Sequence, residues 1–278
     1  MRVLIIGCGY VGKALSKHFL SDGHFVTVTT RHQENVATLR SCSSQVLLFD
    51  GKDYTDLQNV LPSQDLVLLT VAADSPDKYE NTYLKTAQQL LLLSANTLSA
   101  PTLIYTSSTS VYQENQGGIV VEDSLLEETR THSSILIKTE KILQKLSQHG
   151  WKVCIFRLSE IYGPGRSILG RIKNLEGKKL PGDGNKYTNM IHVDDIVGAC
   201  DFAFQNDFSG VFNLSDDDHF LRRKWYDQIA EKYSLKKVEW DETLSSYHGG
   251  NKKVSNQKIK EAGYVFQVPH RQITSPKF

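Results

Sequence analysis

The chain has 278 residues, enough for one large domain or two modest ones, and a chain of this size forms a full core without disulfides or a structural metal. It carries 32 Lys and Arg against 31 Asp and Glu, with no long block of like charge, so the charge pattern typical of nucleic-acid or anionic-membrane partners is missing. Hydrophobic residues at 40% and charged residues at 23% exclude a disordered or fibrous chain.

The cysteines and the first residues indicate the compartment. Cys8, Cys42, Cys154 and Cys200 are scattered singly, without metal-ligand spacing, so we expect them to be reduced and buried and expect no metal. The apolar run at residues 3–6 is too short for a signal peptide, and no segment approaches the ~18 apolar residues of a membrane span. We therefore expect a cytoplasmic protein with no membrane partner.

Strands and helices are predicted in alternation from the first residues onward. Residues 3–6 and 25–29 are β-branched, apolar runs typical of buried parallel strands, and apolar residues recur at helical spacing between them, over 11–20. Further strands are predicted over 46–49, 66–71, 103–106 and 153–158, and helices over about 79–98 and 135–149. This pattern predicts an α/β fold with a doubly wound parallel sheet of the Rossmann type.

The composition changes after about residue 160, where glycines and prolines cluster and long regular strands end. A helix over about 193–204, a strand over 211–214 and a helix over about 224–233 follow. We predict a dinucleotide-binding domain over 1–160, completed by about 187–214. A smaller C-terminal substrate lobe is predicted over 161–186 and 215–278, with a cleft between the two at the carboxyl ends of the strands.

The sequence Gly7-Cys8-Gly9-Tyr10-Val11-Gly12 has the pattern G-x-G-x-x-G and joins the first predicted strand to the first predicted helix. There Gly7 permits a tight turn, Gly9 leaves room for a pyrophosphate, and Gly12 lets helix and strand pack closely. The backbone at Tyr10 and Val11 opens the helix, whose N–H groups are donors for an anion. An ordinary glycine-rich turn is the alternative, but this context favours a dinucleotide site.

The end of the second strand indicates which dinucleotide binds. NAD-binding proteins have an Asp or Glu about 20 residues past the glycine motif, whereas this chain has Thr29-Thr30-Arg31-His32. A carboxylate would repel a 2′-phosphate, while Thr30 and Arg31 could donate hydrogen bonds to one. We therefore predict NADP, with NAD as the alternative, and the simpler interpretation of Arg31 is a solvated surface side chain.

Other positions fit the same ligand. Asp50 closes the third strand, where its carboxylate could accept a hydrogen bond from an adenine amino group or cap a turn. Ala72 and Ala73 end the fourth strand, where a larger side chain would collide with a dinucleotide, although packing alone could also require small residues.

Four patterns extend the analysis along almost the whole chain: YTSSTSVY at 105–112, FRL with IYGPGR at 156–166, IHVDDI at 191–196 and VFNL at 211–214. Together they resemble the extended short-chain dehydrogenase/reductase family, which includes nucleotide-sugar epimerases and dehydratases, and more closely its atypical members. The resemblance implies NAD(P)-dependent oxidoreductase or epimerase chemistry on a small-molecule substrate, and a homodimer formed through two long helices.

The resemblance also implies catalytic roles for Ser108, Ser134 and Lys138. Ser108 matches the family residue that hydrogen-bonds the reacting hydroxyl or carbonyl, although it could instead cap a turn. Where the family has Tyr-x-x-x-Lys on a helix, Lys138 is retained and Ser134 replaces the tyrosine. The family lysine holds the nicotinamide ribose and lowers the tyrosine pKa, and a serine hydroxyl, whose pKa lies far above the phenol's ~10, is a poor substitute.

Three interpretations of this departure remain open. Another group could move the proton, and Tyr112, Tyr162, Glu160 and His132 are the candidates by sequence proximity. Ser134 could position a water. The chain could also bind NADP(H) without catalysis, as a regulatory or redox-sensing protein.

Charged residues in the second half have mostly structural interpretations. Arg166 follows the Gly-Pro-Gly turn, where the family contacts the substrate's nucleotide or phosphate, so an anionic substrate would suit it, with a surface arginine as the alternative. Asp194 and Asp195 are adjacent, do not face together on a helix, and are predicted to charge a helix start. His192 is predicted to pack rather than to bind a metal.

Overall fold

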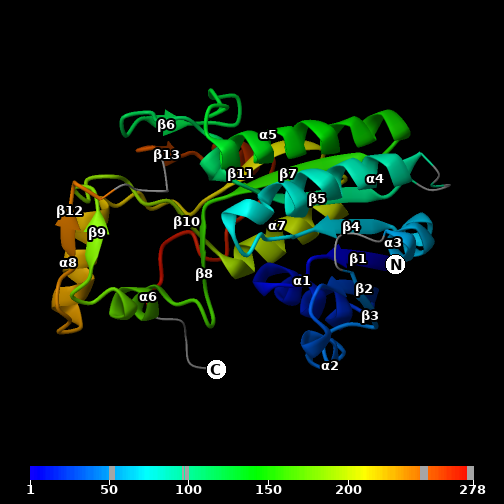
Figure 1. Cartoon of the computed structure of the whole chain (residues 1–278), viewed down its shortest axis with the longest axis horizontal. Coiled ribbons are helices and arrows are strands. Elements are labelled where there is room, and N and C mark those ends of the chain that lie inside the picture. The colour runs from blue at the N-terminus through cyan, green and yellow to red at the C-terminus, as the bar shows by residue number, and fades with distance from the viewer. Residues whose placement is uncertain (50–53, 96, 98–99, 245–249, 274–278) are drawn as a thin grey trace. The chain divides into compact units, whose positions relative to one another are not determined.

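The computed structural model describes residues 1–49, 54–95, 97, 100–244 and 250–273 (Figure 1). The chain divides into two compact units. The first comprises Met1–Val111, Glu128–Arg157 and Val197–Phe212, and the second comprises Tyr112–Glu127, Leu158–Ile196 and Asn213–Phe278. Among the described helices, none is both long enough and apolar enough to cross a bilayer.

A seven-stranded sheet, ordered β11-β7-β5-β4-β1-β2-β3, is the frame of the first unit. Its strands are β1 (Arg2–Ile6), β2 (Phe25–Thr30), β3 (Gln45–Leu48), β4 (Leu66–Leu69), β5 (Thr102–Ser108), β7 (Lys152–Leu158) and β11 (Gly210–Leu214). The pairings from β3 through β5 are parallel, with Val3 opposite both Val26 and Leu66. The central strands β1 and β4 are almost wholly buried, as strands covered on both faces must be. The predicted doubly wound parallel sheet is confirmed.

Helices follow most of these strands. They are α1 (Tyr10–Ser21), α2 (Val36–Leu39), α3 (Thr55–Val60), α4 (Thr86–Ser94), α5 (Thr131–Gln144) and α7 (Val193–Gln205), with short turns η1 (Gln33–Asn35), η2 (Leu61–Ser63), η3 (Pro76–Lys78), η4 (Glu80–Lys85), η5 (Thr109–Val111) and η6 (Lys145–His149). Helices α4 and α5 lie side by side (Figure 1). Residues of α7 from Val197 onward belong to the first unit.

Two predicted helices differ in detail from the observed ones. The helix predicted over 79–98 begins with η4, a π-helical turn, before α4 continues it. A π-turn carries an extra residue that apolar spacing does not reveal. Helix α5 begins at Thr131, four residues before the predicted start, because its first turn is polar and breaks the apolar pattern.

A buried ion pair fastens α5 to the sheet. Glu140 on α5 and Arg157 on β7 have side chains only 4% and 5% exposed, and their closest nitrogen–oxygen distance is 2.8 Å. Ser107 on β5 donates a 2.5 Å hydrogen bond to the same carboxylate. The surrounding core is apolar and includes Leu103, Leu143 and Ile155, so the two charges compensate one another in a region that water does not reach.

In the part of the second unit that the structure describes, short parallel strand pairs combine with short helices. The pairs are β8 (Glu160–Tyr162) with β10 (Met190–His192), β9 (Lys179–Pro181) with β12 (Glu239–Asp241), and β6 (Ile119–Val120) with β13 (Lys253–Val254). The helices are α6 (Ile168–Asn174), α8 (Arg222–Lys232) and α9 (Gln257–Glu261). A separate core that includes Tyr162, Ile172 and Trp225 holds this unit together.

Asp194 and Asp195 both lie in the first turn of α7, as predicted, but their surroundings differ. Asp194 is exposed in the first turn. Asp195 is fully buried, and its carboxylate accepts hydrogen bonds from the backbone N–H groups of Gln267 and Val268 and from the Tyr264 hydroxyl. The sequence-based role for Asp195 was therefore incomplete, because its partners lie far along the chain. Burial raises its pKa.

We predict that Glu140→Ala lowers the free energy of unfolding by about 3–5 kcal/mol, because it removes the carboxylate that pairs with the buried Arg157 guanidinium. Urea denaturation followed by circular dichroism measures this. Lys141→Ala on the same helix is the control, since it removes an ion pair with Glu128 whose side chains are 61% and 62% exposed, and should cost less than about 1 kcal/mol. Equal losses in the two variants would contradict the prediction.

Candidate functional site

The glycine turn between β1 and α1 requires two of its three glycines. Gly7 has φ of +93°, and a Cβ there would lie 2.8 Å from the Val71 Cα. A Cβ on Gly12 would lie 2.5 Å from the Gly7 carbonyl oxygen. The Thr70 hydroxyl donates to that same carbonyl over 2.7 Å, and the Gly7 N–H donates to the Thr29 hydroxyl over 3.0 Å. The turn is therefore held against the ends of β2 and β4.

Gly9 is different, because a Cβ added there would meet nothing within 4 Å. It is exposed and directly precedes α1, whose first residues are Tyr10 and Val11. The first turn of a helix has backbone N–H groups with no acceptor inside the helix. Open space in front of such a helix fits the pyrophosphate of a dinucleotide.

Arg31 reaches from the end of β2 to the end of β4. Its Nη2 donates to the Ala72 carbonyl oxygen over 3.3 Å and to the Asp74 carboxylate over 3.0 Å. The side chain is 34% exposed. Thr30 is buried, and its hydroxyl accepts a hydrogen bond from the His32 N–H. The structure therefore brings Thr30, Arg31 and Ala72 together, whereas Asp50 lies outside the described residues.

A row of rings begins beside Ala73. The Tyr83 hydroxyl accepts a hydrogen bond from the Ala73 N–H over 3.4 Å, and burial raises the Tyr83 pKa. The ring centroids of Tyr83 and Tyr79 are 5.1 Å apart, and those of Tyr79 and His132 are 4.5 Å apart. The row extends from the end of β4, along η4, to the first turn of α5. The predicted helix over 79–98 contains Tyr79 and Tyr83 at a spacing of four, which was the available sequence signal for this pair.

Ser108 is linked to the same turn of α5. The Ser110 N–H donates to the Ser108 hydroxyl over 3.2 Å, and the Ser133 hydroxyl donates to the Ser110 carbonyl oxygen over 2.9 Å. Ser108 thus has the turn-capping contact that its sequence allowed. His132 is the neighbour of Ser133, so the imidazole belongs to the segment tied to the end of β5.

Ser134 and Lys138 lie together on a shallow depression of about 360 Å³. It is also lined by Glu80, Leu84, Glu128, Thr129, Thr131 and Ile135. The buried face of α5 is formed by other residues, among them Leu136 and Glu140, while Lys138 is exposed. Ser108 is not among the described residues that line this depression. The structure therefore groups Ser134 with Lys138, one turn apart, and groups Ser108 with the turn that carries His132.

The other three candidates for proton transfer are engaged elsewhere. The Tyr112 hydroxyl donates to the Asn213 side chain over 2.6 Å and is buried. Tyr162 is 1% exposed and packs edge to face on His192, and burial raises the pKa of its hydroxyl. Glu160 forms an ion pair with Arg171.

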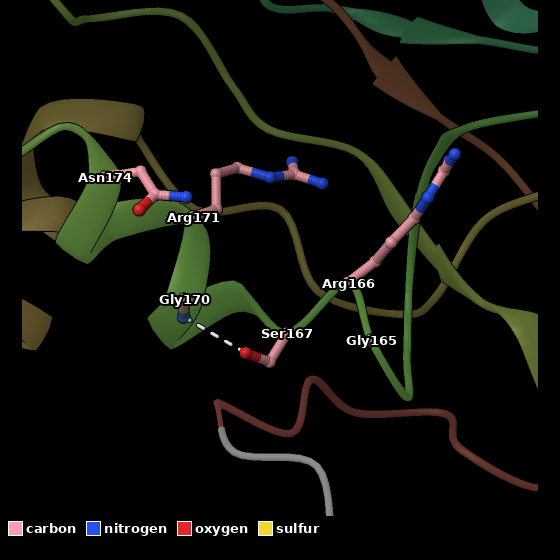
Figure 2. A pocket seen from close by; sticks show the side chains of 6 residues that line it. All are labelled: Gly165, Arg166, Ser167, Gly170, Arg171 and Asn174. Carbon is pink, nitrogen blue, oxygen red and sulfur yellow. Dashed lines mark hydrogen bonds between the residues drawn. The ribbon is translucent and has the colours of Figure 1, made fainter.

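Arg166 lies in the second unit on an open cavity of about 280 Å³ (Figure 2). The cavity is also lined by Gly165, Ser167, Gly170, Arg171 and Asn174. Ser167 caps α6 by accepting a hydrogen bond from the Gly170 N–H over 3.1 Å. Arg171 is held by Glu160 and by the Ile161 carbonyl oxygen. Two arginine residues thus line one cavity.

The parallel sheet and the glycine turn between β1 and α1 define a Rossmann-type α/β fold. A sequence profile of the NAD dependent epimerase/dehydratase family matches residues 3–215. The chain belongs to this family.

Curated proteins of similar sequence include an epimerase. Protein YeeZ of Escherichia coli is 30% identical over 276 residues, covering 96% of both chains. ADP-L-glycero-D-manno-heptose-6-epimerase of Brachyspira hyodysenteriae is 23% identical over 181 residues, covering 58% of this chain and 57% of its own.

Solved structures show the same fold. UDP-N-acetylglucosamine 4-epimerase of Methanobrevibacter ruminantium, in complex with UDP-N-acetylmuramic acid, has a TM-score of 0.81 at 17% identity over 95% of this chain and 92% of its own. UDP-glucuronic acid 4-epimerase of Bacillus cereus, in complex with UDP-glucuronic acid and NAD, has a TM-score of 0.79 at 18% identity over 94% and 92%. A conserved protein of unknown function from Silicibacter pomeroyi has a TM-score of 0.78 at 23% identity over 97% and 94%.

We predict opposite behaviour for two glycine variants. Gly9→Ala should keep its melting temperature, because the added methyl enters open space, but should weaken dinucleotide binding by at least about tenfold. Gly12→Ala should destabilise the fold, because its methyl would overlap the Gly7 carbonyl. Thermal denaturation and fluorescence titration of NADPH measure the two effects, and undiminished binding by Gly9→Ala would contradict the assignment of the pyrophosphate.

Proposed function

We propose that the protein is an NADP-dependent oxidoreductase or epimerase-like enzyme that acts on a carbonyl or hydroxyl group of a small anionic substrate, such as a sugar nucleotide. The observation that carries this proposal is the glycine turn, open at Gly9, with the Arg31 guanidinium at the end of the neighbouring strand. The bound dinucleotide would accept or donate a hydride.

Cofactor binding is assigned to the turn and to the strand ends beside it. Gly7, Gly9 and Gly12 shape the space for the pyrophosphate, with Tyr10 and Val11 at the helix start. Thr30 and Arg31 face the 2′-phosphate in this proposal, and the ion pair with Asp74 holds Arg31 near that position beforehand. An arginine that is already oriented loses less side-chain entropy on binding.

Proton transfer is assigned to His132. Oxidation of an alcohol removes a hydride from carbon and a proton from oxygen, so the chain must supply a base near the reacting oxygen. Ser108 hydrogen-bonds that oxygen, and His132, on the turn tied to Ser108 through Ser110 and Ser133, takes the proton. Tyr79 supports the imidazole by ring contact. Histidine is the side chain that most often serves as a general base in enzymes, whereas a serine hydroxyl does not take this role unaided.

Substrate binding is assigned to the cavity around Arg166. Paired guanidinium groups recognise phosphate oxygens through planar, charge-assisted hydrogen bonds. Arg166 and Arg171 line this cavity. Structural neighbours of this chain bind UDP-sugars, which agrees with an anionic substrate.

Arg31→Ala should weaken NADPH binding by about tenfold to a hundredfold and leave NADH binding nearly unchanged, because a charge-assisted hydrogen bond is worth about 1.5–3 kcal/mol. Titrations followed by tryptophan emission give both affinities. Lys78→Ala is the matched control, since it also removes a cation beside Asp74: the Lys78 Nζ lies 3.8 Å from Asp74 Oδ2. Equal affinity of the wild type for the two dinucleotides would remove the NADP assignment and leave NAD.

His132→Gln should lower turnover by about a hundredfold or more, while NADPH affinity stays the same. Turnover is measured by cofactor consumption, and by mass spectrometry of the products, over a panel of sugar nucleotides and small carbonyl compounds. Lys138→Ala is the comparison. If Lys138→Ala abolishes turnover and His132→Gln does not, the reaction instead uses Ser134 and Lys138, with Ser134 positioning a water.

The missing tyrosine at Ser134 supports a second candidate, a catalytically silent NADP(H)-binding regulatory or redox-sensing protein. Tight NADPH binding, with no product formed from any compound of the panel, would favour it over the enzyme.

A further inference from the structure

The C-terminal end of α1 and the middle of α7 bring three metal-ligating side chains together in the first unit. His18 lies in the last turn of α1, Asp22 caps the C-terminal end of that helix one turn later, and Asp201 lies on α7. One donor atom from each residue lies within 4.8 Å of the other two. Imidazole nitrogen and carboxylate oxygen are ligands that Zn²⁺ and related divalent transition metals accept.

The distances fit a shared ion better than a hydrogen-bonded ion pair. His18 Nε2 is 3.5 Å from Asp22 Oδ2 and 3.7 Å from Asp201 Oδ1. A charged hydrogen bond would bring one oxygen to about 2.7–2.9 Å. An ion about 2.1 Å from the imidazole nitrogen and from a carboxylate oxygen would instead make a nitrogen–ion–oxygen angle of roughly 110–125° with each aspartate, which is near the tetrahedral value.

The imidazole nitrogen of His18 that faces the two aspartates also points to a ligand. His18 Nε2 is shielded from solvent, and among the described residues it has no hydrogen-bond partner. A buried polar atom without a partner costs free energy. A metal bond from the neutral imidazole would satisfy this atom.

Neighbouring groups orient the ligands. The Ser21 hydroxyl donates to Asp22 Oδ1 over 3.4 Å, which leaves Oδ2 facing the imidazole. The Asp22 N–H donates to the His18 carbonyl oxygen over 3.1 Å, so the helix end sets the spacing of these two ligands. The carboxylates are 45% and 30% exposed, so a water has access to the remaining position.

We propose that His18, Asp22 and Asp201 form a binding site for a divalent transition-metal ion such as Zn²⁺, with water as the fourth ligand. The ion ties the end of α1 to α7. Because it lies at the opposite end of α1 from the glycine turn, its role is to stabilise the helix and not to take part in hydride or proton transfer. The site is independent of the function proposed above.

Calorimetric titration of the full chain with ZnCl₂ tests the site, using protein without a histidine tag that has been stripped with EDTA. We expect one site per chain with micromolar affinity, lost in His18→Gln and weakened at least about tenfold in Asp201→Asn. His24→Gln is the matched control, since His24 follows the same helix and should bind as the wild type does. MgCl₂ should give no comparable binding, because Mg²⁺ requires oxygen ligands in octahedral geometry.

A second readout separates ligation from a folding defect. Zn²⁺ should raise the melting temperature of the wild type and of His24→Gln but not that of His18→Gln, and the circular dichroism spectra of all variants should coincide without metal. Co²⁺ in place of Zn²⁺ should give the visible absorption of a four-coordinate ion. Absence of binding by the wild type, or equal binding by His18→Gln, would overturn the proposal.

Discussion

The first unit depends on the close approach of α1 to the ends of β1 and β4. Gly12 lies so near the Gly7 carbonyl that a methyl group would not fit, and the Thr70 hydroxyl donates a hydrogen bond to that carbonyl. The position of α1 is therefore determined at its first turn. This directs the helix N-terminus toward the open space at Gly9, and it also places the other end of the helix, with His18, against α7.

Charges at the strand ends are the basis of the NADP preference that we propose. In a parallel sheet the carboxyl ends of β2 and β4 lie at the same edge, so Arg31 from one strand reaches Ala72 and Asp74 after the other. Asp74 belongs to the loop after β4 and not to the position past the glycine motif where NAD-binding proteins have a carboxylate. In the proposed function, Arg31 offers its positive charge to the 2′-phosphate of NADP, and the Asp74 carboxylate keeps the guanidinium in place.

The chemistry of α5 illustrates the difference between a motif and a site. Ser134 and Lys138 have the spacing of the family pair, and the helix places them together as the spacing requires. The spacing does not reveal the contacts of the polar first turn of α5. Ser133 donates a hydrogen bond to the Ser110 carbonyl oxygen after β5, and the His132 ring contacts the Tyr79 ring. His132, the proton-transfer group that we propose, therefore lies outside the family motif and was only one of four candidates in the sequence.

The residues alone predict the doubly wound sheet, the glycine turn after β1 and the family, because these depend on local spacing: β-branched runs, helical periodicity and glycines where a side chain cannot fit. They leave the acid and base undecided, and they give no sign of the metal site that we propose, because His18 and Asp22 alone are an ordinary helical pair. Only the tertiary structure joined Arg31 to Asp74, His132 to Tyr79, Asp195 to the backbone near Val268, and Asp201 to His18. The physical reason is that a side-chain contact requires a few ångströms in space, and residues distant in sequence reach that separation only when the packing of strands and helices brings them together.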